Sequence, residues 1–578
     1  MLTDSIAQQP KSATNDRFDS AVRSLLHLPT WVWLTVSGLL MAGIYYFAFG
    51  ARFRWSDYGQ LPQQNVALIN KLSPEGAVLF LGSFAALFFL YWMGSRQKLE
   101  TSRLHWILIA GFPVIFSLAL LPMYTVDAAD VYDYIIRGRM SSVYGLNPLS
   151  DTPNSVKQDP FYDFTAWKTV PSAYGPAWEA LSNVVTRLAG DDPWTNVVAY
   201  KLISLAGTAL TALFIALTLQ QLAPRRMLLG VYLFAWNRLV IYISAGNAHN
   251  DTVMTACMLL SVYCLARRWY TASTLAALLG ALVKFVPILM IPIIGVVALR
   301  SLKGSERLRY LACAGILSIA LAVAFFAPYW TGGDPISLSR RERMFTSSVG
   351  TLVHQYLQWQ HWDEGQGVQL ISYTTFGLLG LFLLSELFEV WQQPDVFRAI
   401  RAIIAVLLFY LLVSIVWFQN WYVVWVVALA ALLDNTPMRR FVLFFSYIVT
   451  WQSFLYYYVT LRYDGWSPLP WRDLIPVAVF IGLPWAYVIW FWVSTWYRRL
   501  TRTPLAIAVG ERLRQAREAA QLSPVDLAEQ VSIPTDDVWG YEDGTRTLPI
   551  NRAAALAERL NLSLQELVAP PTPPISNA

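Results

Sequence analysis

The chain has 578 residues, of which 56% are hydrophobic and only 14% charged, and its formal net charge is +6. Soluble domains carry about 25% charged residues, so this composition excludes an ordinary soluble protein. Cys257, Cys264 and Cys313 all lie inside apolar runs, which excludes both a disulfide framework and a cysteine metal cluster.

Apolar runs recur along most of the chain, and a helix that crosses a bilayer needs roughly 20 mostly apolar residues. The first run, 31–49, is too long for the core of a secretory signal peptide, so we predict a retained span after a polar cytoplasmic tail, 1–30. We predict an all-α, polytopic transmembrane bundle of about 12–14 spans. The count is a range because 271–299 could be one long helix kinked at Pro287. The candidate spans are 31–50, 76–94, 105–122, 196–222, 228–243, 252–266, 271–283, 285–299, 310–328, 369–390, 402–416, 422–434, 441–459 and 474–495.

Short basic loops predict the orientation, because cytoplasmic loops collect Lys and Arg. With a cytoplasmic N-terminus these groups fall on one side: Arg96, Lys98 and Arg103; Arg225 and Arg226; Arg267 and Arg268; Arg300, Lys303, Arg307 and Arg309; Arg398 and Arg401; Arg439 and Arg440; Arg498, Arg499 and Arg502. The exceptions are Arg52, Arg54, Lys71, Arg340, Arg341 and Arg343. We therefore expect a plasma-membrane protein with both termini cytoplasmic. Two long polar segments, about 123–195 and 329–368, and a short one at Arg462, Tyr463 and Asp464, then face outward.

The first outer segment opens with carboxylates at helical spacing. Asp127, Asp130 and Asp133 stand at i, i+3 and i+6, so on a helix the first two share a face. A carboxylate near cations can deprotonate an acceptor hydroxyl or hold a divalent cation such as Mg or Mn. Arg137 and Arg139 suit a phosphate, which a guanidinium grips with two parallel hydrogen bonds. The alternative is a solvated loop with ion pairs.

A second outer segment, 245–251, ends in His249, Asn250 and Asp251. Ionisable residues at membrane depth usually have a functional role. The alternative for Asn250 is that it only caps the next span. Lys284 lies outward against the positive-inside trend, so we expect a partner such as Asp251 or an anionic ligand. The alternative is that the Lys284 side chain has no specific partner and extends to the membrane interface.

A third outer segment, 417–422, contains Gln419 and Trp421. An aromatic belt explains Trp and Tyr at a membrane interface without any function, whereas the amides beside aromatic faces also suit a sugar ring. Independent segments thus place Asp, Arg, His, Lys and amide side chains on one face, where a random scatter would divide them between both.

Four blocks carry a family resemblance: DVYDYIIRGRMSSVYGLNP, SAYGPAW, AGNAHND and QNWYVVW. In this order they resemble the polyprenol-phosphate-sugar-dependent membrane glycosyltransferases of the GT-C fold, and most of all the bacterial group with the polyprenol-phosphomannose-dependent mannosyltransferases. The resemblance covers about 31–495. One departure is Ala173, where the family often has Pro or Thr.

The resemblance implies a GT-C-like enzyme that moves mannose, or a similar hexose or pentose, from a polyprenyl-phosphate donor to a glycan, lipid or protein acceptor outside the cytoplasm. It places the catalytic base at Asp130, with Asp127 as the alternative. We expect the donor phosphate at Arg137, Arg139 or Lys284, and substrate contacts at Tyr174, His249, Asn250, Asp251, Gln419 and Trp421. No cofactor is certain, and a divalent cation stays open.

Two other functions also fit a polytopic membrane protein. A transporter or flippase of lipid-linked glycans should show internal repeats and charges at mid-bilayer, whereas here the polar residues sit at span ends. A membrane-tethered regulator would not need so many outward polar motifs.

The last part of the chain has a different character. Residues 510–567 resemble a Cro/C1-type helix-turn-helix domain in Gly510, Leu513, Arg517, Tyr541 and Glu542, and this implies a small all-α cytoplasmic domain at 510–569. The basic linker 496–509 is expected to contact anionic membrane lipids, and 570–578 to be disordered. Six Arg against ten Asp or Glu in 503–569 leave a net charge of −4. DNA binding needs cations opposite phosphates, so a cytoplasmic protein partner is expected more than DNA.

Overall fold

A computed structural model describes residues 29–62, 64–97, 99, 101–127, 129–330, 345–459, 471–522, 524–531, 533 and 535–569. Outside this part of the chain lie almost all of the predicted tail 1–30, the exceptional cations Arg340, Arg341 and Arg343, the outer residues Arg462, Tyr463 and Asp464, and the end 570–578.

The predicted all-α fold is confirmed: the described ranges contain helices and, in place of a sheet, two isolated bridges, Arg54 to Met123 and Thr346 to Trp417. Eight of the described helices are long and apolar enough to cross a membrane. They are α2 with η1 (Thr30–Gly50), α5 (Pro74–Gly94), α6 (Arg103–Leu120), α9 (Pro193–Leu222), α15 with η6 (Gly304–Tyr329), α18 (Glu364–Gln392), α19 with η7 (Val396–Ser414), and Leu474–Arg498 within α24, η11 and α25.

The other apolar runs form broken or shorter helices. Pro224–Ala235 and Arg238–Gly246 are long and apolar enough to cross a membrane only when they are taken together, and the chain bends by 50° between them. Four shorter apolar helices are α12 (Asp251–Ala266), α13 (Tyr270–Val283), η5 with α14 (Val286–Ser301) and η8 with α20 (Asn420–Ala430). The run 271–299 is thus two helices, interrupted at Lys284, whose backbone is extended.

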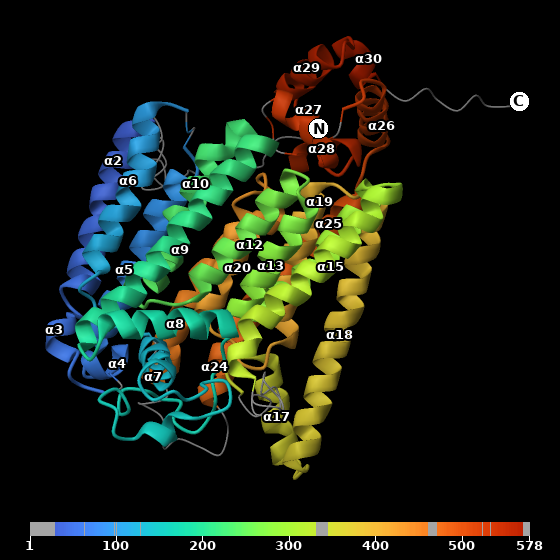
Figure 1. The fold of residues 1–578 in the computed structure, drawn as a ribbon. Helices are drawn as coiled ribbons and strands as arrows, with labels where there is room; N and C mark the ends of the chain where they lie inside the picture. The colour runs from blue at the N-terminus through green and yellow to red at the C-terminus, as the bar shows by residue number, and fades with distance from the viewer. Residues whose placement is uncertain are drawn as a thin grey trace, which may run out of the picture.

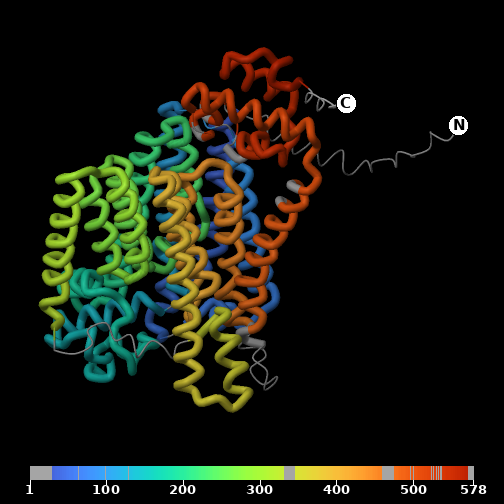
Figure 2. The backbone as a smooth tube through the Cα atoms, turned by 90° about the vertical axis from the view of Figure 1, so that its right-hand side faces the viewer, coloured from blue at the N-terminus to red at the C-terminus, as the bar shows by residue number. Residues whose placement is uncertain are grey.

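The bundle has two different ends, which Figures 1 and 2 show from two sides. One end has α3 (Trp55–Tyr58), α7 (Asp130–Ser142), α8 (Pro176–Ala189) and α17 (Val349–Trp359). Basic loops meet at the other end, where Arg226 lies over the Phe397 ring at 5.2 Å and Arg300 over the Trp391 ring at 5.0 Å. The polar outer segments and the basic loops therefore lie at opposite ends, as the charge pattern predicts.

The hydrophobic core is continuous through the membrane helices, and α12 packs most extensively against α9 and α13. This packing holds Asp251, the first residue of α12, in the interior of the bundle, where it is fully buried.

A separate core organises the C-terminal domain, which comprises α26 (Pro504–Ala519), α27 (Pro524–Val531), α28 (Thr535–Glu542), α29 (Ile550–Arg559) and α30 (Leu564–Val568). Leu513, Leu527, Val538 and Leu556 are its fully buried centre. The linker is shorter than predicted, because α25 (Leu483–Leu500) continues to Leu500 and α26 already begins at Pro504.

Candidate functional site

Asp130 is the first residue of α7, and Asp127 lies in the loop before it. The expected shared helical face of these two carboxylates is therefore not formed. Asp127 is buried, and its Oδ2 accepts a hydrogen bond of 2.8 Å from Asn420 Nδ2. Its backbone N–H donates to Asn247 Oδ1 at 3.1 Å, and the Tyr457 hydroxyl donates to its backbone carbonyl at 3.0 Å. These bonds fix the loop that leads into α7, whereas Oδ1 of Asp127 has no hydrogen-bond partner among the described residues.

The Asp130 side chain is 15% exposed, unlike that of Asp127. Its Oδ2 accepts a hydrogen bond of 3.1 Å from the Tyr174 hydroxyl and lies 3.8 Å from His249 Nδ1. Burial and the nearby Asp133 raise the pKa of Asp130 to about 7, against the opposing influence of Lys284 and the Tyr174 hydrogen bond. A carboxylate with a pKa near the working pH is well suited to accept a proton from a reacting hydroxyl.

Tyr174 reaches Asp130 because the outer segment is fixed on the end of α13. The Gly175 N–H donates a hydrogen bond of 2.9 Å to the Val283 carbonyl. A Cβ atom at Gly175 would lie only 2.1 Å from the Leu282 carbonyl oxygen, so only glycine allows this approach. The contact brings a residue of the first outer segment next to the residue after α13, Lys284.

Lys284 forms the expected ion pair with Asp251. Its Nζ lies 2.9 Å and 3.0 Å from the two carboxylate oxygens, and Trp425 Nε1 donates to Asp251 Oδ1 at 2.7 Å. The ammonium also lies 4.3 Å from the centre of the Tyr422 ring. A lysine ammonium has three donors, and two of the three are directed at Asp251. Since the side chain is 14% exposed, the third donor is available to a ligand.

His249 and Asn250 are fully buried beside Asp130. Asn250 occupies the cap position of α12, but its side chain makes no capping hydrogen bond, so the capping alternative is wrong. Among the described residues, both side-chain atoms of Asn250 and both ring nitrogens of His249 lack a hydrogen-bond partner. Buried polar atoms are normally satisfied by protein or water, so these four atoms fit a polar ligand or ordered water.

The His249 ring stacks on Trp421, with the two ring centres 4.0 Å apart and the planes 19° from parallel. Burial lowers the pKa of His249 well below its usual value, so the ring is neutral at pH 7. Gln419 is half-buried at the start of η8 and makes no side-chain capping bond. The third outer segment therefore joins the site through Trp421.

Asn420 also belongs to the site, although the sequence did not predict it there. It lies between Gln419 and Trp421, and its amide bonds both Asp127 and Ser453. The signal was its position in the same amide-containing segment, but nothing in the sequence pairs it with a carboxylate 293 positions earlier.

Arg137 and Arg139, predicted as candidates for the donor phosphate, both form ion pairs with carboxylates of the first outer segment. Arg137 Nε lies 2.7 Å from Asp133 Oδ2, and both side chains are buried. Arg139 Nε lies 2.8 Å from Asp159 Oδ2, and its Nη1 lies 2.6 Å from Asp191 Oδ1. Both arginines thus link parts of the first outer segment to one another.

A divalent cation needs several oxygen ligands. Within the described residues, no three His, Cys, Asp or Glu side chains gather in a way that could hold a metal ion. The carboxylates of Asp127 and Asp251 are already bonded to Asn420 and Lys284. The side chains of the described residues therefore do not form a ready metal site.

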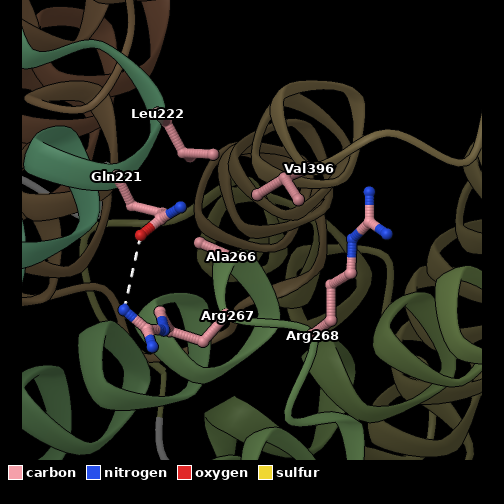
Figure 3. A pocket seen from close by; sticks show the side chains of 6 residues that line it. All are labelled: Gln221, Leu222, Ala266, Arg267, Arg268 and Val396. Atoms are coloured by element: carbon pink, nitrogen blue, oxygen red, sulfur yellow. Dashed lines mark hydrogen bonds between the residues drawn. The ribbon is translucent and has the colours of Figure 1, made fainter.

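A shallow hollow of about 540 Å³ lies elsewhere, lined by Gln221, Leu222, Ala266, Arg267, Arg268 and Val396 (Figure 3). Arg267 donates a hydrogen bond of 3.4 Å to Gln221 Oε1. Arg267 follows the last residue of α12, whereas Asp251 is the first. At 1.5 Å per residue, the hollow is about 24 Å from the acidic site along this helix, so it is not part of that site.

Comparison with known proteins supports the resemblance. Residues 33–300 match the sequence model described as alpha-(1->6)-mannopyranosyltransferase, N-terminal domain. The membrane part is similar to bacterial mannosyltransferases. Residues 508–569 match a helix-turn-helix domain, so the predicted combination of a mannosyltransferase-like part with such a domain is confirmed.

Two curated relatives are both named alpha-(1->6)-mannopyranosyltransferase A. The protein from Corynebacterium glutamicum is 25% identical over 146 residues, which cover 25% of this chain and 28% of the relative. The protein from Mycobacterium tuberculosis is 22% identical over 256 residues, which cover 43% of this chain and 49% of the relative. The chain thus spans at most about half the length of the curated relatives that it matches.

Proposed function

We propose that the membrane part transfers a mannosyl unit from a polyprenyl-phosphate donor to a hydroxyl group of a glycan, lipid or protein acceptor. The family match over 33–300 supports mannosyl transfer as the reaction. The absence of a nucleotide-binding motif from the sequence supports a lipid-phosphate donor, because such a donor needs no nucleotide site.

The observation that carries the proposal is the environment of Asp130. It is a partly exposed carboxylate whose pKa is raised to about 7, and it lies where Tyr174 and His249 converge from two other segments. Asp127 carries less of the argument, because its carboxylate is buried and bonded to Asn420.

In the reaction, Asp130 accepts the proton of the acceptor hydroxyl as the oxygen attacks the anomeric carbon of the donor. The new glycosidic bond forms while the bond between that carbon and the phosphate oxygen breaks. The phosphate leaves on the polyprenyl chain with the electron pair, and Asp130 later releases its proton to solvent. A carboxylate in this role contributes typically 10²–10⁴-fold to the rate.

Lys284 is assigned to the donor phosphate. Its third N–H and its positive charge stabilise the charge that develops on the leaving group. Arg137 and Arg139 are not used, because Asp133, Asp159 and Asp191 already neutralise them.

The free polar atoms of His249 and Asn250 are assigned to sugar hydroxyls, and the Trp421 ring to a sugar face. Hydroxyl groups both donate and accept hydrogen bonds, so they satisfy an amide and a neutral imidazole together. Asp251 acts indirectly, by orienting Lys284.

The site is assigned to the non-cytoplasmic face of the plasma membrane. The basic loops meet at the opposite end of the bundle, and such loops remain in the cytoplasm. Membranes that contain the chain should transfer labelled mannose from polyprenyl-phosphate mannose, and not from a nucleotide-linked mannose once endogenous lipid carriers are removed. Transfer from the nucleotide donor alone under these conditions would contradict the proposal.

A further inference from the structure

Helix α28 of the C-terminal domain contacts the basic end of the membrane part. In a helix-turn-helix domain the second helix of the motif is the one that reads DNA, and here this helix is α28. The Arg401 guanidinium, in α19, lies over the Trp539 ring of α28 at 5.2 Å. Arg502 donates a hydrogen bond of 3.2 Å to the backbone carbonyl of Asp543, one residue beyond α28. Figures 1 and 2 both show the domain seated at this end of the bundle.

Asp537 and Glu542, two carboxylates of α28, pair within their own domain. Asp537 pairs with Arg546 and Arg552, and both oxygens of Glu542 bond Arg517 at 2.6 Å and 3.0 Å. These pairs engage Arg517, Arg546 and Arg552 with acidic side chains of the same domain, which leaves them less positive charge to offer nucleic acid phosphates. Trp539 is instead a large side chain of α28 that stays 36% exposed.

The opposite charges of the two parts also favour contact between the C-terminal domain and the membrane part. Residues 503–569 have a net charge of −4. The end of the membrane part that they face has the basic loops, with Arg225, Arg226, Arg267, Arg268, Arg398, Arg401, Arg439 and Arg440. An acidic domain tethered by the three residues between α25 and α26 is held at high effective concentration beside these cations.

We propose that the DNA-reading face of the helix-turn-helix domain is a docking surface for the membrane part of its own chain. The partner is the basic end of the bundle, and Trp539 against Arg401 is the central contact. While the domain is docked, α28 is not available to a DNA groove. This docking does not require sugar transfer.

The test is a distance measurement between spin labels in the full chain, in bilayers. The labels replace exposed Gln393, just after α18, and exposed Asn551, in α29, in a chain whose three cysteines are changed to alanine. Docking predicts one narrow distance distribution. Arg401→Glu and Trp539→Ala should each broaden it, because charge repulsion or loss of the ring removes the contact.

Two controls separate docking from damage. Arg309→Glu makes the same charge change at an exposed site of α15, and should leave the distribution narrow. A label pair at Gln393 and Lys303, both in the membrane part, should be unchanged in every variant. A broad distribution in the unaltered chain, or a narrow one that neither Arg401→Glu nor Trp539→Ala broadens, would overturn the proposal.

Discussion

The Tyr174 hydroxyl donates a hydrogen bond of 3.1 Å to Asp130 Oδ2, across 44 positions of the sequence. This bond favours the ionised carboxylate and so lowers the pKa of Asp130, opposing burial and Asp133, which raise it. Tyr174 is therefore a positioning residue that also sets the proton affinity of the proposed base.

The pH dependence of transfer should report this balance. Asp130 must be ionised to accept a proton, so the rate should rise with pH through a pKa of about 7. Tyr174→Phe removes a hydrogen bond to the ionised form, which raises the pKa, and the rising limb should move to higher pH. The measurement is kcat/KM from pH 5 to 9 for both proteins. If the rising limb stays in place or moves to lower pH, the Tyr174 hydroxyl does not lower the pKa of the base.

Lys284→Gln tests the phosphate assignment. The change removes the positive charge near the leaving group, so the apparent KM for the polyprenyl-phosphate donor should rise more than that for the acceptor. Lys168→Gln is the matched control, because that lysine pairs with Asp163 at 3.4 Å in the outer segment and should leave both values unchanged. Equal increases for donor and acceptor in Lys284→Gln would indicate a structural role.

Arg137→Gln should affect stability rather than donor binding. It leaves the buried carboxylate of Asp133 without its ion-pair partner, and breaking a buried pair costs about 3–5 kcal/mol. Thermal unfolding in detergent should show the loss. The donor KM of the folded fraction should stay near that of the unaltered chain. Exposed Arg187→Gln in α8 should change stability by less than about 0.5 kcal/mol. A stable Arg137→Gln protein with a raised donor KM would indicate that Arg137 binds the donor and has no structural role.

The sequence predicted the helical membrane fold and its two different ends, because hydropathy and loop charge depend on local composition. It also predicted the pair of Lys284 with Asp251, since a lone cation at an apolar helix end needs a partner. The partners of Arg139 were not predictable, because Asp159 and Asp191 lie 20 and 52 positions away and meet it only in the folded chain. The same holds for Asn420 and Asp127. The sequence also suggested a capping role for Asn250, whereas its side chain makes no capping hydrogen bond.

The orientation can be measured without any substrate. A tag inserted after Asn154, in the segment between α7 and α8, should react with a membrane-impermeant reagent on intact cells. A tag after Ala569 should react only after the cells are opened. The opposite labelling would place the site in the cytoplasm and contradict the proposed donor face.

The most direct measurement is a single-turnover assay of purified Asp130→Asn with labelled polyprenyl-phosphate mannose and the acceptor fraction of the membranes. Asparagine keeps the shape of the side chain but cannot accept the proton, so we expect a rate roughly 10²–10⁴-fold lower with unchanged thermal stability. Asp127→Asn is the comparison. Transfer by Asp130→Asn near the rate of the unaltered chain, with Asp127→Asn inactive and folded, would show that Asp130 is not the base.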